Sequence, residues 1–147
     1  MTAFELKPIG IVHAPFKSRE AIANSNKDDN IGTIEISMDY AEGLDDIDGF
    51  SHIILVCWLH RSTFHSLKVK PIYHPEKLRG IFATRHPDRP NPIAITVLEL
   101  LGRKGNILKV KGIDLLDGTP VLDIKPYTRR DRRDQTNFGW LSEKKFP

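Results

Sequence analysis

The segment His52-Ile-Ile-Leu-Val-Cys-Trp-Leu59 contains the longest apolar run of the chain. An extended strand made from it is apolar on both faces, so we expect a strand that is buried on both sides. The run is far shorter than the roughly 20 residues that a membrane-spanning helix needs. Cys57, the single cysteine, cannot form an internal disulfide and is expected to be a small core residue.

Short strand-like segments lie on either side of this run, separated by turns rich in Gly, Pro and Asp. They cover residues 8–13, 33–38, 67–70, 92–100, 107–111 and 120–125. Helical signals are limited to residues 18–24 and 39–48. The pattern predicts an all-β fold, a small β-barrel with one or two short helices. We expect residues 1–147 to form a single domain, with the last twenty residues as a C-terminal extension on the barrel or on a partner subunit.

The composition is typical of a globular domain, because 39% of the 147 residues are hydrophobic and 28% are charged. The N-terminus lacks a signal pattern, so we expect a cytoplasmic protein that does not associate with membranes. Glycine-rich nucleotide fingerprints, a nucleophile elbow and zinc-type histidine spacing are all absent. We therefore expect no metal site and no nucleotide binding of the Rossmann or P-loop type.

The stretch Gly80-Ile-Phe-Ala-Thr-Arg-His-Pro-Asp-Arg-Pro-Asn-Pro-Ile93, here called the proline arm, is the most distinctive part of the chain. Its prolines fix their own φ angles and keep the preceding residues out of the α region, which predicts a stiff, extended arm and neither a helix nor a central strand. Rigidity lowers the entropy cost of binding, and the arm carries Arg85, His86, Arg89 and Asn91. A pre-organised binding loop and a structural turn that carries charge both fit this composition.

A second unusual stretch is Ile113-Asp-Leu-Leu-Asp-Gly-Thr-Pro-Val-Leu-Asp-Ile-Lys-Pro-Tyr127, with a tight turn expected at Asp117 and Gly118. Backbone groups exposed at such a turn can bind a small polar ligand, and carboxylates suit a cation or a ribose diol. An ordinary hairpin whose aspartates make Asx-turn bonds also accounts for the pattern.

The formal net charge of +3 comes entirely from the last twenty residues, which hold six Lys or Arg and three acidic residues. Their centre is the cluster Arg129-Arg-Asp-Arg-Arg133. The cluster can contact nucleic-acid phosphates, and it is also compatible with a solvated tail.

Taken together, these stretches resemble the TrmO family, also called the TsaA-like or YaeB-like family. The resemblance extends from about residue 4 to residue 127 and rests on four matches, at residues 9–16, 49–53, 82–93 and 114–127. Ala94 and Thr96 depart from the Gly and Ser that are usual in the family. The larger C-terminal domain of the bacterial members has no counterpart, so the chain resembles a short, single-domain form.

The resemblance implies a methyltransferase that uses S-adenosyl-L-methionine and acts as a homodimer. The implied substrate is tRNA with N6-threonylcarbamoyladenosine next to the anticodon, and the product carries a methyl group on N6 of that base. The implied cofactor-binding set includes Phe16 as an aromatic wall, Arg85 facing the methionine carboxylate and Ile95 packing against adenine. The full set is Ala14, Pro15, Phe16, His52, Ile53, Arg85, Ile95, Leu115, Leu116, Asp117 and Gly118.

For the substrate, we hypothesise that Arg89 lies near the threonyl carboxylate. N6 is acylated and its lone pair is delocalised, so a basic setting of Arg85 and Arg89 is expected to favour an anionic nitrogen. The expected substrate-binding set is Arg89, Asn91, Lys125, Tyr127, Arg129 and Arg130. Two alternatives stay open: a non-catalytic module that binds S-adenosyl-L-methionine or another nucleoside, and a methyltransferase with a different substrate.

Overall fold

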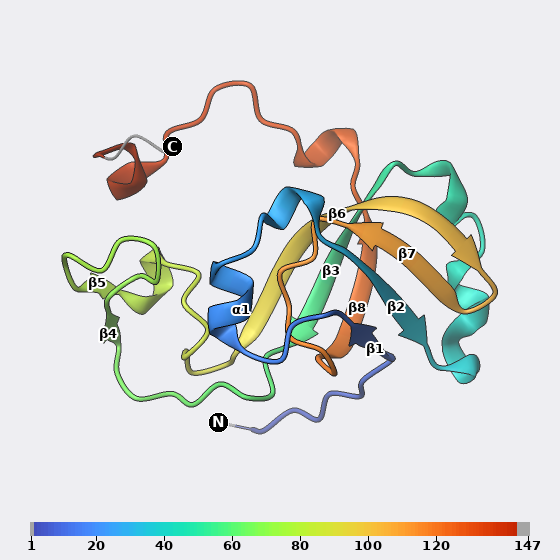
Figure 1. Cartoon of the computed structure of the whole chain (residues 1–147), viewed down its shortest axis with the longest axis horizontal. Helices are drawn as coiled ribbons and strands as arrows, with labels where there is room; N and C mark the ends of the chain where they lie inside the picture. The colour runs from blue at the N-terminus through green and yellow to red at the C-terminus, as the bar shows by residue number, and fades with distance from the viewer. Residues whose placement is uncertain (1, 144–147) are drawn as a thin grey trace.

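A six-stranded barrel forms the centre of the molecule in the computed structural model, which describes residues 2–143 (Figure 1). The barrel is closed and antiparallel, with the strand order β1-β2-β7-β6-β3-β8. Its strands are β1 (Gly10–His13), β2 (Ile31–Ile36), β3 (His52–Trp58), β6 (Ile93–Lys104), β7 (Ile107–Lys111) and β8 (Pro120–Pro126). The prediction of an all-β barrel is confirmed. Part of the basic tail, Lys144 and Lys145, lies outside the described residues, as does Met1.

The helices are short and connect the strands. Between β1 and β2 lie the helix α1 (Arg19–Ala23) and the 3-10 turn η1 (Lys27–Asp29), and α1 begins at Ser18, whose Oγ accepts a hydrogen bond of 3.1 Å from the Ala21 N–H. Two 3-10 turns, η2 (Met38–Leu44) and η3 (Ile47–Gly49), connect β2 to β3, where the sequence predicted one helical segment. Within residues 2–143, no helix is long and apolar enough to cross a membrane.

Alternate strand residues point into the barrel and form the core. Those with 0% exposure include Val12, Ile34, Ile53, Leu55, Cys57, Leu98, Leu108, Val110 and Val121. Burial raises the pKa of the Cys57 thiol to about 12, so the thiol stays protonated at neutral pH and is a core group, as expected.

Only one face of β3 is fully buried, so the prediction that both faces are buried is wrong. A closed barrel has a single interior, and the alternate residues Ile54, Val56 and Trp58 therefore face outward, where they are half-buried. Their cross-strand neighbours on β6 are also apolar and exposed: Val97 (48%), Ile95 (54%) and Ile93 (38%). We call these three cross-strand pairs the β3–β6 apolar face.

The chain between β3 and β6 leaves the barrel and forms a separate projection (Figure 1). This projection contains β4 (Lys68–Val69), β5 (Arg79–Gly80) and the 3-10 turn η4 (Ile81–Ala83). The first residues of the proline arm include a helical turn, contrary to the prediction that the arm holds no helix, because no proline directly follows these residues. The edge strand that ends at Gly80 is compatible with the prediction, which excluded only a central strand. From Thr84 to Pro92 the arm has neither helix nor strand, as the prolines predict.

The C-terminal extension, with the turns η5 (Arg129–Asp131) and η6 (Gly139–Glu143), crosses from the barrel to this projection (Figure 1). Trp140 Nε1 donates a hydrogen bond of 2.8 Å to the Ala83 carbonyl. The Arg79 guanidinium lies 4.8 Å from the Trp140 ring centroid, and the His74 ring meets it edge-on at 5.7 Å. The extension thus packs on the projection of its own chain, whereas the sequence predicted contact with the barrel or with a partner.

The closed barrel leaves no room for a side chain at Gly10 in β1. A Cβ there would overlap the Glu35 backbone oxygen and lie 2.9 Å from Cδ1 of Ile36. We expect Gly10→Ala to lower the free energy of unfolding by about 1–3 kcal/mol, measured by urea unfolding. The matched control is Gly102→Ala in β6, where a Cβ meets nothing within 4 Å and the expected change is below about 0.5 kcal/mol. Equal effects at both positions would contradict this account of the barrel.

Candidate functional site

A cavity of about 600 Å³ opens at the end of the barrel where β3 ends and β6 begins. Its wall is built from six segments: the β1–β2 connection, the residues after β3, the β4–β5 loop, the proline arm, the start of β6 and the loop before β8. Apolar groups in the lining include Ile22, Leu59, Ala94, Leu115 and Leu116. The charged groups are Arg19, Lys27, Arg61, Arg85, Arg89 and Asp114. The size and the mixture of apolar walls with a few charges suit an organic ligand of cofactor size.

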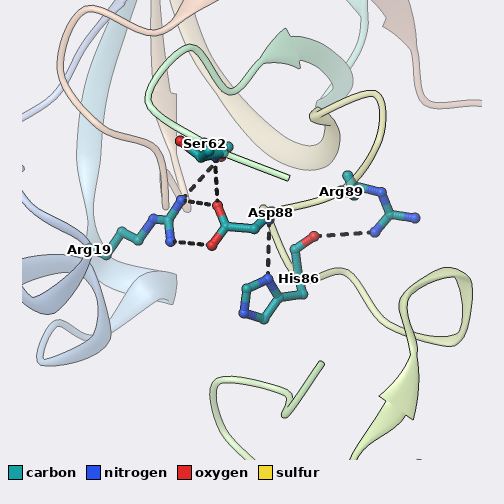
Figure 2. Close-up of polar contacts among 6 residues, drawn as sticks. Arg19, Ser62, His86, Asp88 and Arg89 are labelled. Carbon is teal, nitrogen blue, oxygen red and sulfur yellow. Dashed lines mark hydrogen bonds and ion pairs between the residues drawn. The ribbon is translucent and has the colours of Figure 1, made fainter. Parts of the chain in front are cut away.

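The proline arm is fastened to α1 by a bidentate ion pair between Arg19 and Asp88 (Figure 2). The two hydrogen bonds are 3.1 and 2.7 Å long, and Arg19 also donates to Ser62 Oγ at 3.2 Å. Asp88 accepts a further bond of 3.1 Å from the Thr63 N–H. The hydrogen bond to Arg19 lowers the pKa of Asp88, which therefore stays ionised and holds three segments of the cavity wall together.

Hydrogen bonds inside the arm add to the rigidity that the prolines supply. Burial lowers the pKa of His86, so its ring is neutral at pH 7 and Nδ1 accepts a bond of 3.1 Å from the Asp88 N–H (Figure 2). Arg89 Nη1 donates to the Thr84 carbonyl at 2.9 Å and to the His86 carbonyl at 3.4 Å. Within residues 2–143, the exposed Arg85 side chain has no hydrogen bond or ion pair, so its guanidinium is available at the cavity.

Four of the expected cofactor residues, Arg85, Ile95, Leu115 and Leu116, line this cavity. Arg89, which was expected to bind the substrate, also lines the cavity. Asn91, from the same expected set, is exposed farther along the proline arm. Ile95 also belongs to the β3–β6 apolar face, so it lies at the edge where the cavity meets the outer barrel surface.

Two stretches of the expected cofactor set, residues 14–16 and 115–118, lie side by side, and the second includes the cavity residues Leu115 and Leu116. The Asp117 N–H donates to the Phe16 carbonyl at 2.8 Å, while the Asp117 carboxylate accepts from the Ala14 N–H at 3.0 Å and from Lys17 Nζ at 2.8 Å. These hydrogen bonds, chiefly the one from Lys17, lower the pKa of Asp117. Gly118 has a φ of +84°, in agreement with the predicted tight turn. Pro15 is exposed, whereas Phe16 is only 6% exposed, with its ring in the core.

The remaining expected residues lie at the opposite end of β3. Ile53 is 0% exposed in the core, and the His52 ring lies 6.2 Å from the Tyr127 ring. Tyr127 and Arg129 line a second, shallower groove of about 430 Å³, together with Phe50, Thr128 and Arg132. Arg130 is exposed in η5 beside this groove, and Lys125 pairs with Asp123 at 2.9 Å on the barrel surface. The structure therefore divides the predicted site between the two ends of β3.

The sequence did not single out several residues that build the cavity. Arg19 and Lys27 come from the β1–β2 connection, and Thr96 is the inward-facing neighbour of Ile95. Asp88 carried no signal of its pairing with Arg19, which is 69 residues away in the chain. Within the described part of the chain, no three His, Cys, Asp or Glu residues are grouped in a way that could hold a metal ion.

By its fold and its cavity, this chain is a small, closed antiparallel β-barrel with space for a ligand at one end. The family model described as tRNA-methyltransferase O N-terminal domain matches residues 11–131. The chain therefore belongs to the TrmO family, as its motifs predicted.

Known relatives agree with this assignment. A probable S-adenosyl-L-methionine-binding protein of Pyrococcus abyssi is 50% identical over 141 residues, which cover 93% of this chain and 76% of the relative. The tRNA (adenine(37)-N6)-methyltransferase of Escherichia coli is 33% identical over 86% of this chain and 59% of its own length. A crystal structure of TrmO from Pseudomonas aeruginosa superimposes with a TM-score of 0.78 at 32% identity, covering 95% of this chain and 63% of that one. The chain thus spans about three fifths of the solved TrmO protein.

The Arg19–Asp88 pair predicts a pH-dependent stability. The pKa of Asp88 is lower in the folded than in the unfolded chain, so its contribution is present above the ordinary value of 3.8 and is lost as the pH falls through the lowered value. We expect Asp88→Asn to lower the free energy of unfolding by about 1 kcal/mol at pH 7, since Arg19 is partly exposed. Urea unfolding from about pH 7 to pH 3 should show this difference shrinking below about pH 4.

The matched control for this variant is Asp39→Asn, at an exposed position of η2, which is expected to change stability little at any pH. A difference between the wild type and Asp88→Asn that is constant over the whole range would show that the ion pair does not fasten the arm.

Proposed function

We propose that this chain is a methyltransferase that uses S-adenosyl-L-methionine to methylate N6 of threonylcarbamoyladenosine, next to the anticodon of tRNA. The observation that carries the proposal is the cavity, in a chain of the TrmO family, where a rigid arm presents an available arginine over apolar walls. The proposal includes residues 1–147 acting as a single domain, and an intracellular location follows from tRNA as the substrate.

The residues of the cavity fit the cofactor. S-adenosyl-L-methionine has a carboxylate, a cationic sulfonium and a flat base, and it supplies an activated methyl group. The available guanidinium of Arg85 is suited to the carboxylate. Leu59, Ala94 and Leu115 offer the apolar surface that the base needs, and a volume of about 600 Å³ is sufficient for the whole molecule.

The role of the protein in this reaction is alignment and charge stabilisation. The attacking nitrogen must lie in line with the methyl carbon and the sulfur, and a rigid arm reduces the freedom that would spoil this alignment. The N6 nitrogen is a poor nucleophile while it is protonated and conjugated to the carbamoyl group. Arg85 and Arg89, both at the cavity, would stabilise the anion that forms when the N6 proton passes to solvent water, and this anion attacks the methyl carbon. The Thr84 and His86 carbonyls hold Arg89 in place.

The groove at the other end of β3 has the chemistry of an RNA contact. Phe50 and Tyr127 are 38% and 36% exposed there, and aromatic rings of this kind stack on unpaired bases. Arg129 and Arg132 line the same groove and suit phosphates. Thr128 and Asp131 form a capping box that fixes the backbone between these groups, so the groove is preformed.

A homodimer across the β3–β6 apolar face would unite the two parts of the site. Exposed apolar patches of this kind on soluble proteins mark interfaces. A two-fold axis that runs across the strands would reverse β3 relative to its copy. The His52 end of one protomer, with its groove, would then lie beside the cavity of its partner, so that cofactor and RNA meet at a shared site.

A labelling experiment tests the activity. The protein is incubated with methyl-labelled S-adenosyl-L-methionine and with tRNA from a strain that lacks this methylation, and the nucleosides are then separated. We expect label in the threonylcarbamoylated adenosine, more than tenfold less with Arg85→Met, and an intermediate amount with Arg85→Lys, which keeps the charge. Cofactor binding without transfer would favour a non-catalytic module, and label in another nucleoside would favour a different substrate.

The dimer is tested by sedimentation. Val97→Asp places a charge in the β3–β6 apolar face and is expected to yield monomers at concentrations where the wild type is dimeric. Ile31→Asp is the matched control, because Ile31 is also 48% exposed but belongs to β2, on the opposite wall of the barrel. A wild type that sediments as a monomer, or a dimer that survives Val97→Asp, would rule out this interface.

A further inference from the structure

The projection between β3 and β6 carries aromatic and basic side chains that the proposed site does not use (Figure 1). The rings of Phe64, Tyr73 and Phe82 are 45%, 68% and 76% exposed. The first 127 residues are neutral in sum, yet residues 64–82 hold four Lys or Arg and a single acidic residue, Glu76. Uncovered rings on a cationic segment form a surface that suits an anionic partner with flat groups.

This surface is continuous with the cavity. Ile72 and Tyr73, in the β4–β5 loop, line the cavity, and so do Thr84 and Arg85, which directly follow η4. Phe82 lies in η4, two residues before this wall begins. Because Tyr73 is both a wall residue and largely exposed, it lies at the mouth of the cavity, where a polymer that inserts one of its groups would pass.

The turn that presents Tyr73 is held in place from both sides. The His74 N–H donates a hydrogen bond of 3.1 Å to the carbonyl of the buried Pro71, which closes the turn around Tyr73. The His74 ring meets the Trp140 ring edge-on, and Trp140 also bonds to the Ala83 carbonyl, next to Phe82. One side chain thus fixes the segments that carry both exposed rings. A ring that is positioned in advance loses little freedom when it binds a ligand.

The basic groups of the projection favour RNA over a protein partner. Lys68, Lys70 and Lys77 are exposed, and within residues 2–143 their ammonium groups form no ion pair or hydrogen bond. Protein–protein interfaces are depleted in lysine. Proteins that bind single-stranded nucleic acid, in contrast, combine cations for the phosphates with exposed rings for the bases.

We propose that the projection binds the unpaired nucleotides of an RNA loop. Tyr73 stacks on a base at the mouth of the cavity, Phe82 extends this platform, and the three lysines contact phosphates. A base that leaves its own stack exchanges its former neighbours for the ring of Tyr73. The inference rests on the proposed function, which makes RNA the substrate, and it adds a surface that is separate from the groove at Phe50 and Tyr127.

The test compares a fluorescent RNA hairpin that has an unpaired loop with a fully paired RNA duplex of the same length. Fluorescence anisotropy measures both affinities and needs no methyl transfer. We expect the wild type to prefer the hairpin, because the bases of a duplex are already stacked. Tyr73→Ala should bind the hairpin about tenfold more weakly and the duplex unchanged, whereas Tyr73→Phe, which keeps the ring, should behave as the wild type does. The matched control is Tyr40→Ala, since Tyr40 is 43% exposed in η2 and should not contribute.

The salt dependence of hairpin binding tests the phosphate contacts. Replacement of the three projection lysines by glutamine should reduce the slope of log affinity against log salt by about 2, because each phosphate contact to a single strand contributes about 0.7. The matched control carries three glutamines at other exposed lysines and should keep the slope of the wild type. Its positions are Lys7, Lys104 and Lys109.

The outcomes separate the inference from the proposed function. If the wild type binds no RNA, both fail. If it binds the hairpin and Tyr73→Ala binds equally well, or loses hairpin and duplex alike, only this inference fails. A protein that binds the hairpin through Tyr73 but transfers no methyl group to tRNA keeps the inference and loses the proposed function.

Two further measurements on Tyr73→Ala can overturn the inference. A loss of S-adenosylhomocysteine binding in calorimetry as large as the loss of hairpin binding would assign the ring to the cofactor. A change in sedimentation relative to the wild type would show that the projection joins two copies of the chain.

Discussion

Closure of the barrel by β8 is the constraint on which the rest of the structure depends. β8 pairs with β1 on one side and with β3 on the other, so every strand has two neighbours. A closed sheet has one interior, and the apolar side chains that do not fit there must face outward. The run after His52 supplies side chains to both surfaces: Ile53, Leu55 and Cys57 fill the core, while Ile54, Val56 and Trp58 leave an apolar outer face. One strand thereby serves the core and a surface that is available to a partner.

The cavity exists because long connections converge at one end of this barrel. No single element builds the wall of the cavity, and the segments that form this wall are joined by side-chain contacts. The carboxylate of Asp88 is the main junction, since Arg19 from α1 and the Thr63 backbone both bond to it. Prolines restrict the backbone of the arm, and carbonyl bonds to Arg89 restrict its side chain, so the polar groups of the arm are fixed before any ligand arrives.

The fold was predictable from local patterns, whereas the site was predictable only in part. Alternation and turn residues are local signals, and they located the six barrel strands to within a few residues. Whether the outer face of β3 is buried depends on closure of the sheet into a barrel. The sequence of one strand contains no information about that closure. Arg85, Ile95, Leu115 and Leu116, which line the cavity, were named because they lie in motifs that resemble those of the family. Arg19 and Lys27 lie in an unremarkable connection, and their place at the cavity follows from the path of the chain in three dimensions.

The pairing of Gly10 with Val121 joins segments from near the two ends of the described chain. Such non-local contacts require closure of a very long loop before they stabilise anything, so they form late and slowly. During synthesis, β1 emerges long before β8, and until then the partly built sheet exposes two open edges that can pair with other chains. The closed barrel that protects the finished molecule is thus the feature that makes its folding dependent on the last strand.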